Sequence, residues 1–156
     1  MGSEWRFQTI PLVLEGGIHM PYSWTVGRVG SRFFEELRDR GRILASMCSG
    51  CHKVYVPPRL RCPVCFCESK KDMRYVGPAG FIRHFTVVHY HHPVQPIKPP
   101  FAYAVIDLDG ADNGITHFVR CSDYTLLEAG TRVFPVMARE RKGCILDIAY
   151  FEPAGG

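Results

Sequence analysis

The sequence lacks a long apolar run and a long run of one charge. The apolar stretch 10–14 is too short for a signal-peptide core or a membrane span, and no basic region precedes it. Lys and Arg total 19 against 15 Asp and Glu, without the clustered basic runs typical of nucleic-acid-binding proteins. We therefore expect a soluble cytoplasmic protein without membrane contact, whose net charge of +4 permits an anionic ligand.

The common catalytic signatures are also missing. The sequence has no glycine-rich phosphate loop and no Gly-x-Ser-x-Gly elbow. Three aspartates between residues 107 and 112 resemble a calcium loop, but Ala111 and Phe118 stand where an EF-hand needs oxygen ligands. Four histidines crowd one expected strand and its exit without a carboxylate to complete a metal site: His84, His89, His91 and His92. The sequence thus identifies no catalytic residue.

What the chain does have is a pair of closely spaced cysteine motifs. Cys48 and Cys51 form one Cys-x-x-Cys pair, and Cys62 and Cys65 form a second one after ten residues. Two such knuckles can complete a tetrahedron of thiolates around one ion. The pattern predicts a structural Zn²⁺ site on these four residues.

Other chemistries for these cysteines are less favoured. Two disulfides or a dithiol redox centre would be the alternatives, but no flanking helix pattern supports a redox motif. Iron of the rubredoxin type uses the same ligands, and zinc is favoured because structural four-thiolate sites are mostly zinc. The total of seven cysteines is odd, which fits a reducing compartment. Cys67, Cys121 and Cys144 are then expected to be ordinary buried free thiols.

An extended arm and one amphipathic helix are expected before the cysteines. Residues 1–23 contain prolines and glycines with little periodicity, so we interpret them as an arm. Between residues 25 and 40 apolar side chains recur at helical spacing, and Gly41 can end that helix. The apolar stripe consists of Val26, Val29, Phe33 and Leu37, with Phe34 widening it.

The second half of the chain has the pattern of short strands. A proline-rich loop at 91–100 and turn residues at 109–114 separate them. Thr125–Ala129 favours one helical turn. Strands are expected at 54–56, 73–76, 81–90, 101–108, 115–120, 132–138 and 145–151. The barrel strands among them suit a small Greek-key barrel of the OB type better than a sandwich, which would need more strands.

These elements predict a mainly β protein with an N-terminal helix, in three parts. Residues 1–44 form the arm and helix, 45–71 the zinc ribbon and 72–152 the OB barrel. The ribbon is the most basic part, through Lys53, Arg59, Arg61, Lys70 and Lys71. These cations form either a solvated face or a patch for phosphate.

Three stretches together resemble a widespread microbial family of acyl-CoA-associated proteins, formerly domain of unknown function thirty-five. They are Phe33-Phe34-Glu35-Glu36-Leu37, then Cys48-x-x-Cys51-x-x-x-Tyr55-x-Pro57-Pro58-Arg59-x-x-Cys62-Pro63-x-Cys65, then the strand from Phe101 to Asp109. The resemblance covers about residues 22–152. It implies a helical segment, a rubredoxin-like zinc ribbon and an OB-fold. His52 and Phe66 depart from the pattern, because small residues such as Gly commonly follow the knuckles.

The resemblance also implies a function. Members of the family look like accessory subunits of thiolase-like enzymes, and also of aldolase and hydratase partners. It implies that this chain is a non-catalytic subunit of a β-ketoacyl-CoA thiolase complex, an acyltransferase. The chain would share the coenzyme A thioester with its partner, and the phosphates would meet Lys53, Arg59 and Arg61. The alternative is a module that binds single-stranded nucleic acid, since zinc ribbons and OB barrels also serve that role.

Overall fold

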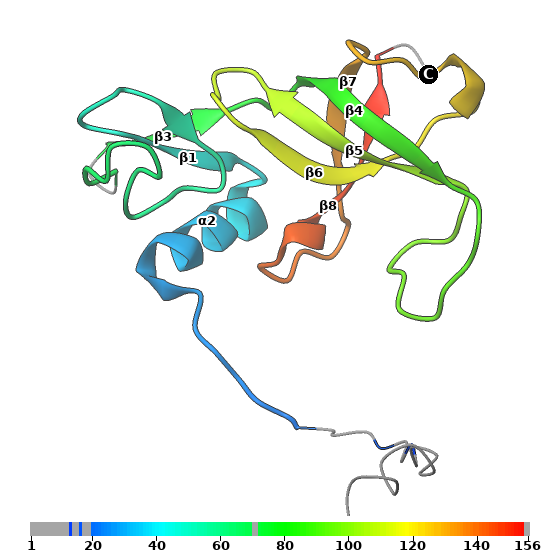
Figure 1. The fold of residues 1–156 in the computed structure, drawn as a ribbon, viewed down its shortest axis with the longest axis horizontal. Coiled ribbons are helices and arrows are strands. Elements are labelled where there is room, and N and C mark those ends of the chain that lie inside the picture. Colours follow the sequence, from blue (N-terminus) through cyan, green and yellow to red (C-terminus); the bar gives the residue numbers. More distant parts are fainter. Residues whose placement is uncertain (1–12, 14–15, 17–19, 70–71, 155–156) are drawn as a thin grey trace, which may run out of the picture.

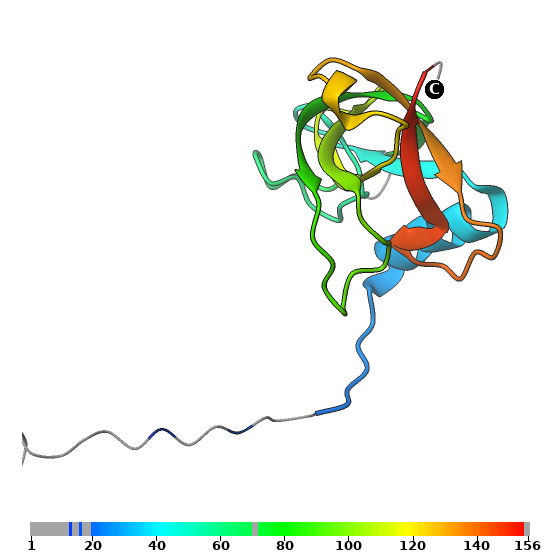
Figure 2. The ribbon, with the colours of Figure 1, turned by 90° about the vertical axis from the view of Figure 1, so that its right-hand side faces the viewer.

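The computed structural model describes residues 13, 16, 20–69 and 72–154. A helix, a three-stranded sheet and a closed barrel follow one another along the chain (Figure 1). Most of the expected arm, and both Lys70 and Lys71, lie outside the described residues. Residues 20–26 run away from the folded part in both views (Figures 1 and 2). None of the helices in these described ranges is long and apolar enough to cross a membrane.

Helix α2 (Gly27–Arg40) forms where the apolar periodicity predicted it. Phe33 and Leu37 are buried, while Val26 at its start remains 43% exposed. Gly41 ends the helix in the left-handed conformation, with φ of 63°, and its N–H donates to the Leu37 carbonyl. Glu36 is also buried and accepts a hydrogen bond from the Tyr75 hydroxyl at 3.0 Å, which ties the helix to the sheet.

The first sheet has the order β2-β1-β3, with both pairs antiparallel. Its strands are β1 (Ile43–Met47), β2 (Val54–Tyr55) and β3 (Asp72–Val76). The sequence did not predict β1, whose first four residues are all buried and show no alternation. The β3 strand lies on the barrel side of the boundary expected at residue 72, yet it pairs with β1 of the ribbon.

The five remaining strands close into a barrel with the order β4-β5-β6-β8-β7, in which only β6 and β8 pair in parallel among the described strands. This is the small OB-type barrel predicted from the strand pattern. Gly80 lets β4 pass close to β5, since a Cβ there would lie 2.4 Å from the Asp107 carbonyl oxygen. The strands are β4 (Gly80–Val88), β5 (Phe101–Leu108), β6 (Gly114–Val119), β7 (Arg132–Met137) and β8 (Ile148–Pro153).

Two 3₁₀ turns complete the barrel: η1 (Tyr124–Leu126) and η2 (Ile145–Asp147). The η2 turn is held by buried polar groups. Asp147 accepts hydrogen bonds from the backbone N–H groups of Lys142 and Gly143, both at 2.8 Å. The Nε2 atom of His117, on β6, lies 3.2 Å from the Ile145 carbonyl oxygen. This segment packs on α2, so it joins the helix to the barrel.

One continuous core runs through helix, sheet and barrel. It includes Phe33 and Leu37 of α2, Ile43 of β1, and Ile106 and Phe151 of the barrel. Because all three parts share buried apolar side chains, unfolding one of them exposes apolar surface on the others.

A polar clamp adds to this core where the β5–β6 turn meets the free edge of β2. Asp112 accepts a hydrogen bond from the Val54 N–H at 2.7 Å and donates its own N–H to the Val54 carbonyl at 2.9 Å. The side-chain oxygen of Asn113 accepts a hydrogen bond from the Val56 N–H at 2.8 Å, and its side-chain N–H donates to the Val56 carbonyl at 2.7 Å. Four hydrogen bonds therefore join the barrel to the ribbon. They occupy the edge of β2, where a further strand could otherwise pair.

Candidate metal centre

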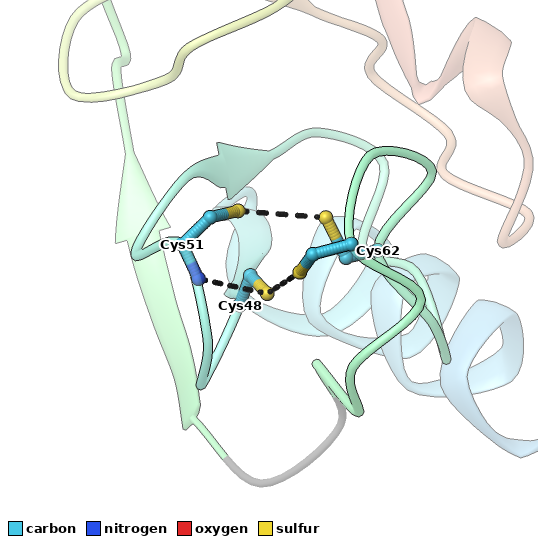
Figure 3. Close-up of side chains that lie close together, drawn as sticks. Cys48, Cys51 and Cys62 are labelled. Carbon is cyan, nitrogen blue, oxygen red and sulfur yellow. Dashed lines mark hydrogen bonds between the residues drawn. The ribbon is translucent and has the colours of Figure 1, made fainter.

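The two knuckles bring four thiols together at the end of the ribbon sheet. Cys48 follows directly after β1, and Cys51 lies just before β2. Cys62 and Cys65 lie in the loop that returns to β3. Figure 3 shows the side chains of Cys48, Cys51 and Cys62 pointing toward one another. All four sulfurs lie within 4.8 Å of one another, and among the described residues no other group of His, Cys, Asp or Glu meets this criterion.

The distances fit a single tetrahedral ion. A Zn–S bond of about 2.3 Å implies sulfurs about 3.8 Å apart at the corners of a tetrahedron. The Cys48 and Cys65 sulfurs lie 3.3 Å apart, and those of Cys51 and Cys62 lie 3.5 Å apart. A small outward movement would therefore seat the ion. Four sulfur donors with no oxygen donor suit Zn²⁺ or iron and not Mg²⁺ or Ca²⁺.

The first knuckle directs backbone N–H groups at its first sulfur. Gly50 and Cys51 donate to the Cys48 sulfur at 3.3 and 3.5 Å. The His52 N–H donates to the Cys48 carbonyl at 3.0 Å. Such donors stabilise a thiolate over a neutral thiol.

The second knuckle repeats this arrangement. Val64 donates to the Cys62 sulfur at 3.4 Å, and the Phe66 N–H donates to the Cys62 carbonyl at 3.1 Å. His52 and Phe66 occupy equivalent positions, and both have φ of 59°. This left-handed conformation is the one that glycine adopts without strain. His52 and Phe66, which were noted as departures in the sequence, therefore adopt a backbone conformation that favours glycine.

The electrostatics of the cluster call for a cation. Burial would raise the pKa of Cys62, but hydrogen bonds from the Tyr55 hydroxyl and two backbone N–H groups lower it to about 5. A hydrogen bond from the Cys67 N–H acts to lower the pKa of Cys65. The neighbouring thiols, first Cys48, oppose its ionisation more strongly and raise this pKa to about 12. Four thiolates this close therefore need a compensating positive charge, which a divalent metal supplies.

Tyr55 is a further part of the site. Its ring is buried beside Cys48 and Cys62, and its hydroxyl lies 3.4 Å from the Cys62 sulfur. That hydrogen bond is the main cause that raises the pKa of Tyr55 to about 12. Tyr55 is part of the sequence motif, but the sequence gave it no role. Only the folded structure shows that its hydroxyl reaches the Cys62 sulfur.

The three cations expected to meet coenzyme A have different surroundings. Lys53 is exposed just before β2. The guanidinium of Arg59 lies 5.8 Å from the centre of the Tyr55 ring. Arg61 donates to the Phe66 carbonyl at 3.1 Å and so braces the second knuckle. All three side chains are exposed: Lys53 lies before β2, Arg59 lies after it, and Arg61 lies beside the second knuckle.

The aspartates weighed as a calcium loop take structural roles. Asp107 pairs with Arg83, and Asp109 pairs with Arg132. One expectation about the cysteines was wrong: Cys67 and Cys144 are exposed and Cys121 is half-buried, so these thiols are not core residues. Cys67 and Cys144 lie in exposed loops, whereas the half-buried Cys121 packs against the core.

Two family models match this chain. ChsH2, rubredoxin-like zinc ribbon domain, matches residues 36–68, and ChsH2, C-terminal OB-fold domain, matches residues 74–138. Among curated protein sequences, none matches the chain.

Two solved structures share its fold. One is an Ltp2-ChsH2(DUF35) aldolase; it is 21% identical, with a TM-score of 0.61 over 84% of this chain and 98% of that one. The other is a protein of unknown function from the DUF35 family of Sulfolobus solfataricus; it is 18% identical, with a TM-score of 0.62 over 83% of this chain and 85% of that one. With its two matched domains, four clustered cysteines and closed barrel, the chain belongs to the ChsH2 (DUF35) family of zinc-ribbon and OB-fold proteins.

Proposed function

We propose that this chain is a non-catalytic accessory subunit of a thiolase-type enzyme complex that acts on an acyl-CoA thioester. The proposal is carried by exposed apolar side chains at the start of α2 and in the ribbon loop, named here the helix–knuckle face: Trp24, Val26, Leu60, Val64 and Phe66. Trp24 is 72% exposed, Phe66 71% and Leu60 53%. Val26 and Leu60 line one groove, and exposed apolar side chains that share a groove favour a protein partner.

A groove lies between Val26 on the helix side of this face and Leu60 on its ribbon side. Its volume is about 490 Å³, and it runs between the first turn of α2 and the loop of Pro58 and Leu60. Val26 and Val29 line one wall, and Arg28 is the one charged residue among those lining it. An apolar segment of a partner with an acidic residue beside it would fit this groove.

The partner would supply the chemistry. Within the described residues, no cysteine or serine side chain is hydrogen-bonded to a histidine, so no nucleophile–base pair is seen. The structural neighbour Ltp2-ChsH2(DUF35) aldolase, by its name, joins a ChsH2 chain to an enzyme. That pairing supports an enzyme as partner, and the thiolase type and the acyl-CoA substrate are part of our proposal.

The metal centre would serve this role as a structural support. We assign Zn²⁺ to Cys48, Cys51, Cys62 and Cys65, on the geometry and donor chemistry given above. The ion would fix both knuckles and thereby hold Leu60, Val64 and Phe66 at the surface. The residues of the chain position the partner, and the ion itself takes no part in the reaction.

Lys53, Arg59 and Arg61 would meet the phosphates of the coenzyme at the edge of the same region. Lys and Arg bind phosphate through charge-assisted hydrogen bonds. Arg61 already donates to the Phe66 carbonyl, so we assign the phosphate contact first to Arg59. The nucleic-acid alternative gains no support, since Arg83 and Arg132 on the barrel are each paired with an aspartate.

The test is co-expression with a thiolase-type subunit, followed by size-exclusion chromatography and a thiolysis assay. Leu60→Asp and Phe66→Asp should abolish co-elution, because each puts a charge into the apolar interface. Val94→Asp is the matched control, since Val94 is exposed on the distant 91–100 loop. Co-elution of all three variants at the parent level would show that the partner does not bind the helix–knuckle face.

The coenzyme role is tested in the assembled complex. Lys53→Ala and Arg59→Ala should each raise the KM for acyl-CoA by about 3–10-fold while assembly is retained. Lys98→Ala, in the loop 91–100, is the control. Unchanged KM in both variants would remove the coenzyme role and leave only scaffolding.

A further inference from the structure

Cys67 places a fifth thiol beside the metal centre. It lies two residues after Cys65, and both residues are exposed. A Cβ at Gly50 would lie 2.8 Å from the Cys67 sulfur and 3.3 Å from the Cys65 sulfur. Both sulfurs therefore converge on the backbone of Gly50, and the turn at Phe66 brings their residues to the same side.

The backbone of Cys67 is held while its thiol stays accessible. Its carbonyl accepts a hydrogen bond from the Cys62 N–H at 2.9 Å. Cys48 and Cys62 are buried, so an oxidant from solvent reaches Cys65 and Cys67 before them. The remaining thiols lie elsewhere: Cys121 contacts the Asp123 carbonyl, and Cys144 contacts the Asp147 carboxylate.

We propose that Cys65 and Cys67 form an oxidation site at which a hydroperoxide converts the metal centre into a metal-free disulfide form. The inference rests on the four-thiolate zinc site proposed above. Exposed thiols next to a second cysteine are the ones that oxidise reversibly, because the second sulfur traps the sulfenic acid as a disulfide.

The chemistry balances with hydrogen peroxide as the oxidant. The Cys67 sulfur attacks one peroxide oxygen, the O–O bond breaks, and Cys67 sulfenic acid and water form. The Cys65 thiolate then attacks the sulfenic sulfur, the S–S bond forms, and hydroxide leaves. Two electrons pass from the two sulfurs to the peroxide. Zn²⁺ loses one of its four ligands and is released, since three thiolates hold it less firmly.

The experiment compares the full-length parent with Cys67→Ser and Cys67→Ala, after zinc analysis of each fresh preparation. Hydrogen peroxide is added, zinc release is followed with a chromophoric chelator, and the disulfide is mapped by peptide mass spectrometry. We expect zinc release to slow by about fivefold or more in both variants, because the thiol that reacts with the peroxide is gone. The parent should yield a peptide containing residues 65–67 with two hydrogens fewer, and dithiothreitol with zinc should restore the site.

Cys144→Ser is the matched control, because Cys144 is an exposed thiol just before η2, and it should release zinc at the parent rate. Zinc release at the parent rate from both Cys67 variants, or an oxidised parent without the 65–67 linkage, would overturn the oxidation site while the metal centre stands. A fresh parent preparation without zinc would contradict the metal centre itself, and the oxidation site with it.

Discussion

His117 makes the stability of the barrel depend on pH. It is 2% exposed, and its ring packs against Phe118 and Phe151. Burial lowers its pKa, although a hydrogen bond with the Ile145 carbonyl opposes that shift. The unfolded chain therefore binds a proton at higher pH than the folded one. Stability is fully present above the ordinary pKa of 6.5 and falls as the pH drops from there toward the folded-state pKa.

We expect urea unfolding of the parent to lose at most about 1.4 kcal/mol per pH unit from this group between about pH 7 and about pH 5. His117→Gln should flatten that slope, because glutamine keeps a donor for the Ile145 carbonyl and does not titrate. His84→Gln, at an exposed position on β4, should keep the parent slope. A slope unchanged by His117→Gln would show that another group causes the pH dependence.

His52 holds a backbone conformation that costs free energy for any residue with a Cβ. Its φ of 59° is shared only by Phe66 among the described non-glycine residues. His52→Gly should therefore raise the free energy of unfolding by up to about 1 kcal/mol, and His52→Val should lower it by about 1–2 kcal/mol. Thermal unfolding of the zinc-loaded protein measures both. Lys53→Gly, next in the chain, should destabilise the protein; the same gain there would show that the conformation of His52 is not the cause.

The ribbon depends on its metal more than the barrel does. Cys51→Ser removes one sulfur donor, so we expect the zinc content to fall well below one ion per chain. Amide exchange should then speed up in β1, β2 and β3 more than in β4 to β8. Elemental analysis and hydrogen-exchange mass spectrometry provide the measurements. Cys121→Ser, remote from the cluster, is the control. Full zinc content and unchanged exchange in Cys51→Ser would contradict the ligand assignment.

The sequence predicted those elements whose signal is local. The cysteine spacing indicated the ribbon, the apolar period of Val29, Phe33 and Leu37 indicated α2, and turn residues separated the barrel strands. It did not predict β1, because a short strand buried on both faces shows no alternation. Nor did it indicate that β3 pairs with β1, since the choice of partner depends on which surfaces meet after folding.

The residues of the candidate site also fall into two groups. Some have a local sequence pattern, and others are placed by contacts between residues far apart in the sequence. The four cysteines lie at recognisable spacing, so the cluster was predictable from local sequence. The approach of the Cys67 sulfur to Gly50 depends on how two separate loops fold against each other. The role of Asn113 likewise depends on contact with Val56, 57 residues away along the chain. No local pattern encodes such distant contacts.

The clamp is expected to couple ribbon and barrel into one unfolding unit. Asn113→Ala removes the two hydrogen bonds to Val56 and leaves that backbone without partners on one side, which should cost about 1–3 kcal/mol. Asn113→Asp keeps the acceptor and loses the donor, so its cost should be intermediate. Denaturant unfolding followed by probes in ribbon and barrel measures both values. Equal stability of parent and Asn113→Ala would contradict the coupling.

The isolated chain should be catalytically silent. We expect no thiolysis of acyl-CoA by the chain alone and full activity only in complex with its partner, because the partner supplies the nucleophile and the acid–base groups. An activity assay on the separately purified subunits and on the mixture measures this. Turnover by the chain alone, unchanged after immunodepletion of any partner, would contradict the accessory role.

The clamp also sets an order of events during synthesis. Both knuckles leave the ribosome, and can bind the ion, before residues 112 and 113 emerge. The pairs at Val54 and Val56 span 58 and 57 residues, so a nascent chain exposes the bare β2 edge for about 3–12 s at ordinary translation rates. An open edge recruits other strands. A ribosome that stalls after both knuckles have emerged and before Asp112 emerges therefore exposes a folded ribbon with an unpaired strand edge, a natural substrate for a chaperone that shields such edges.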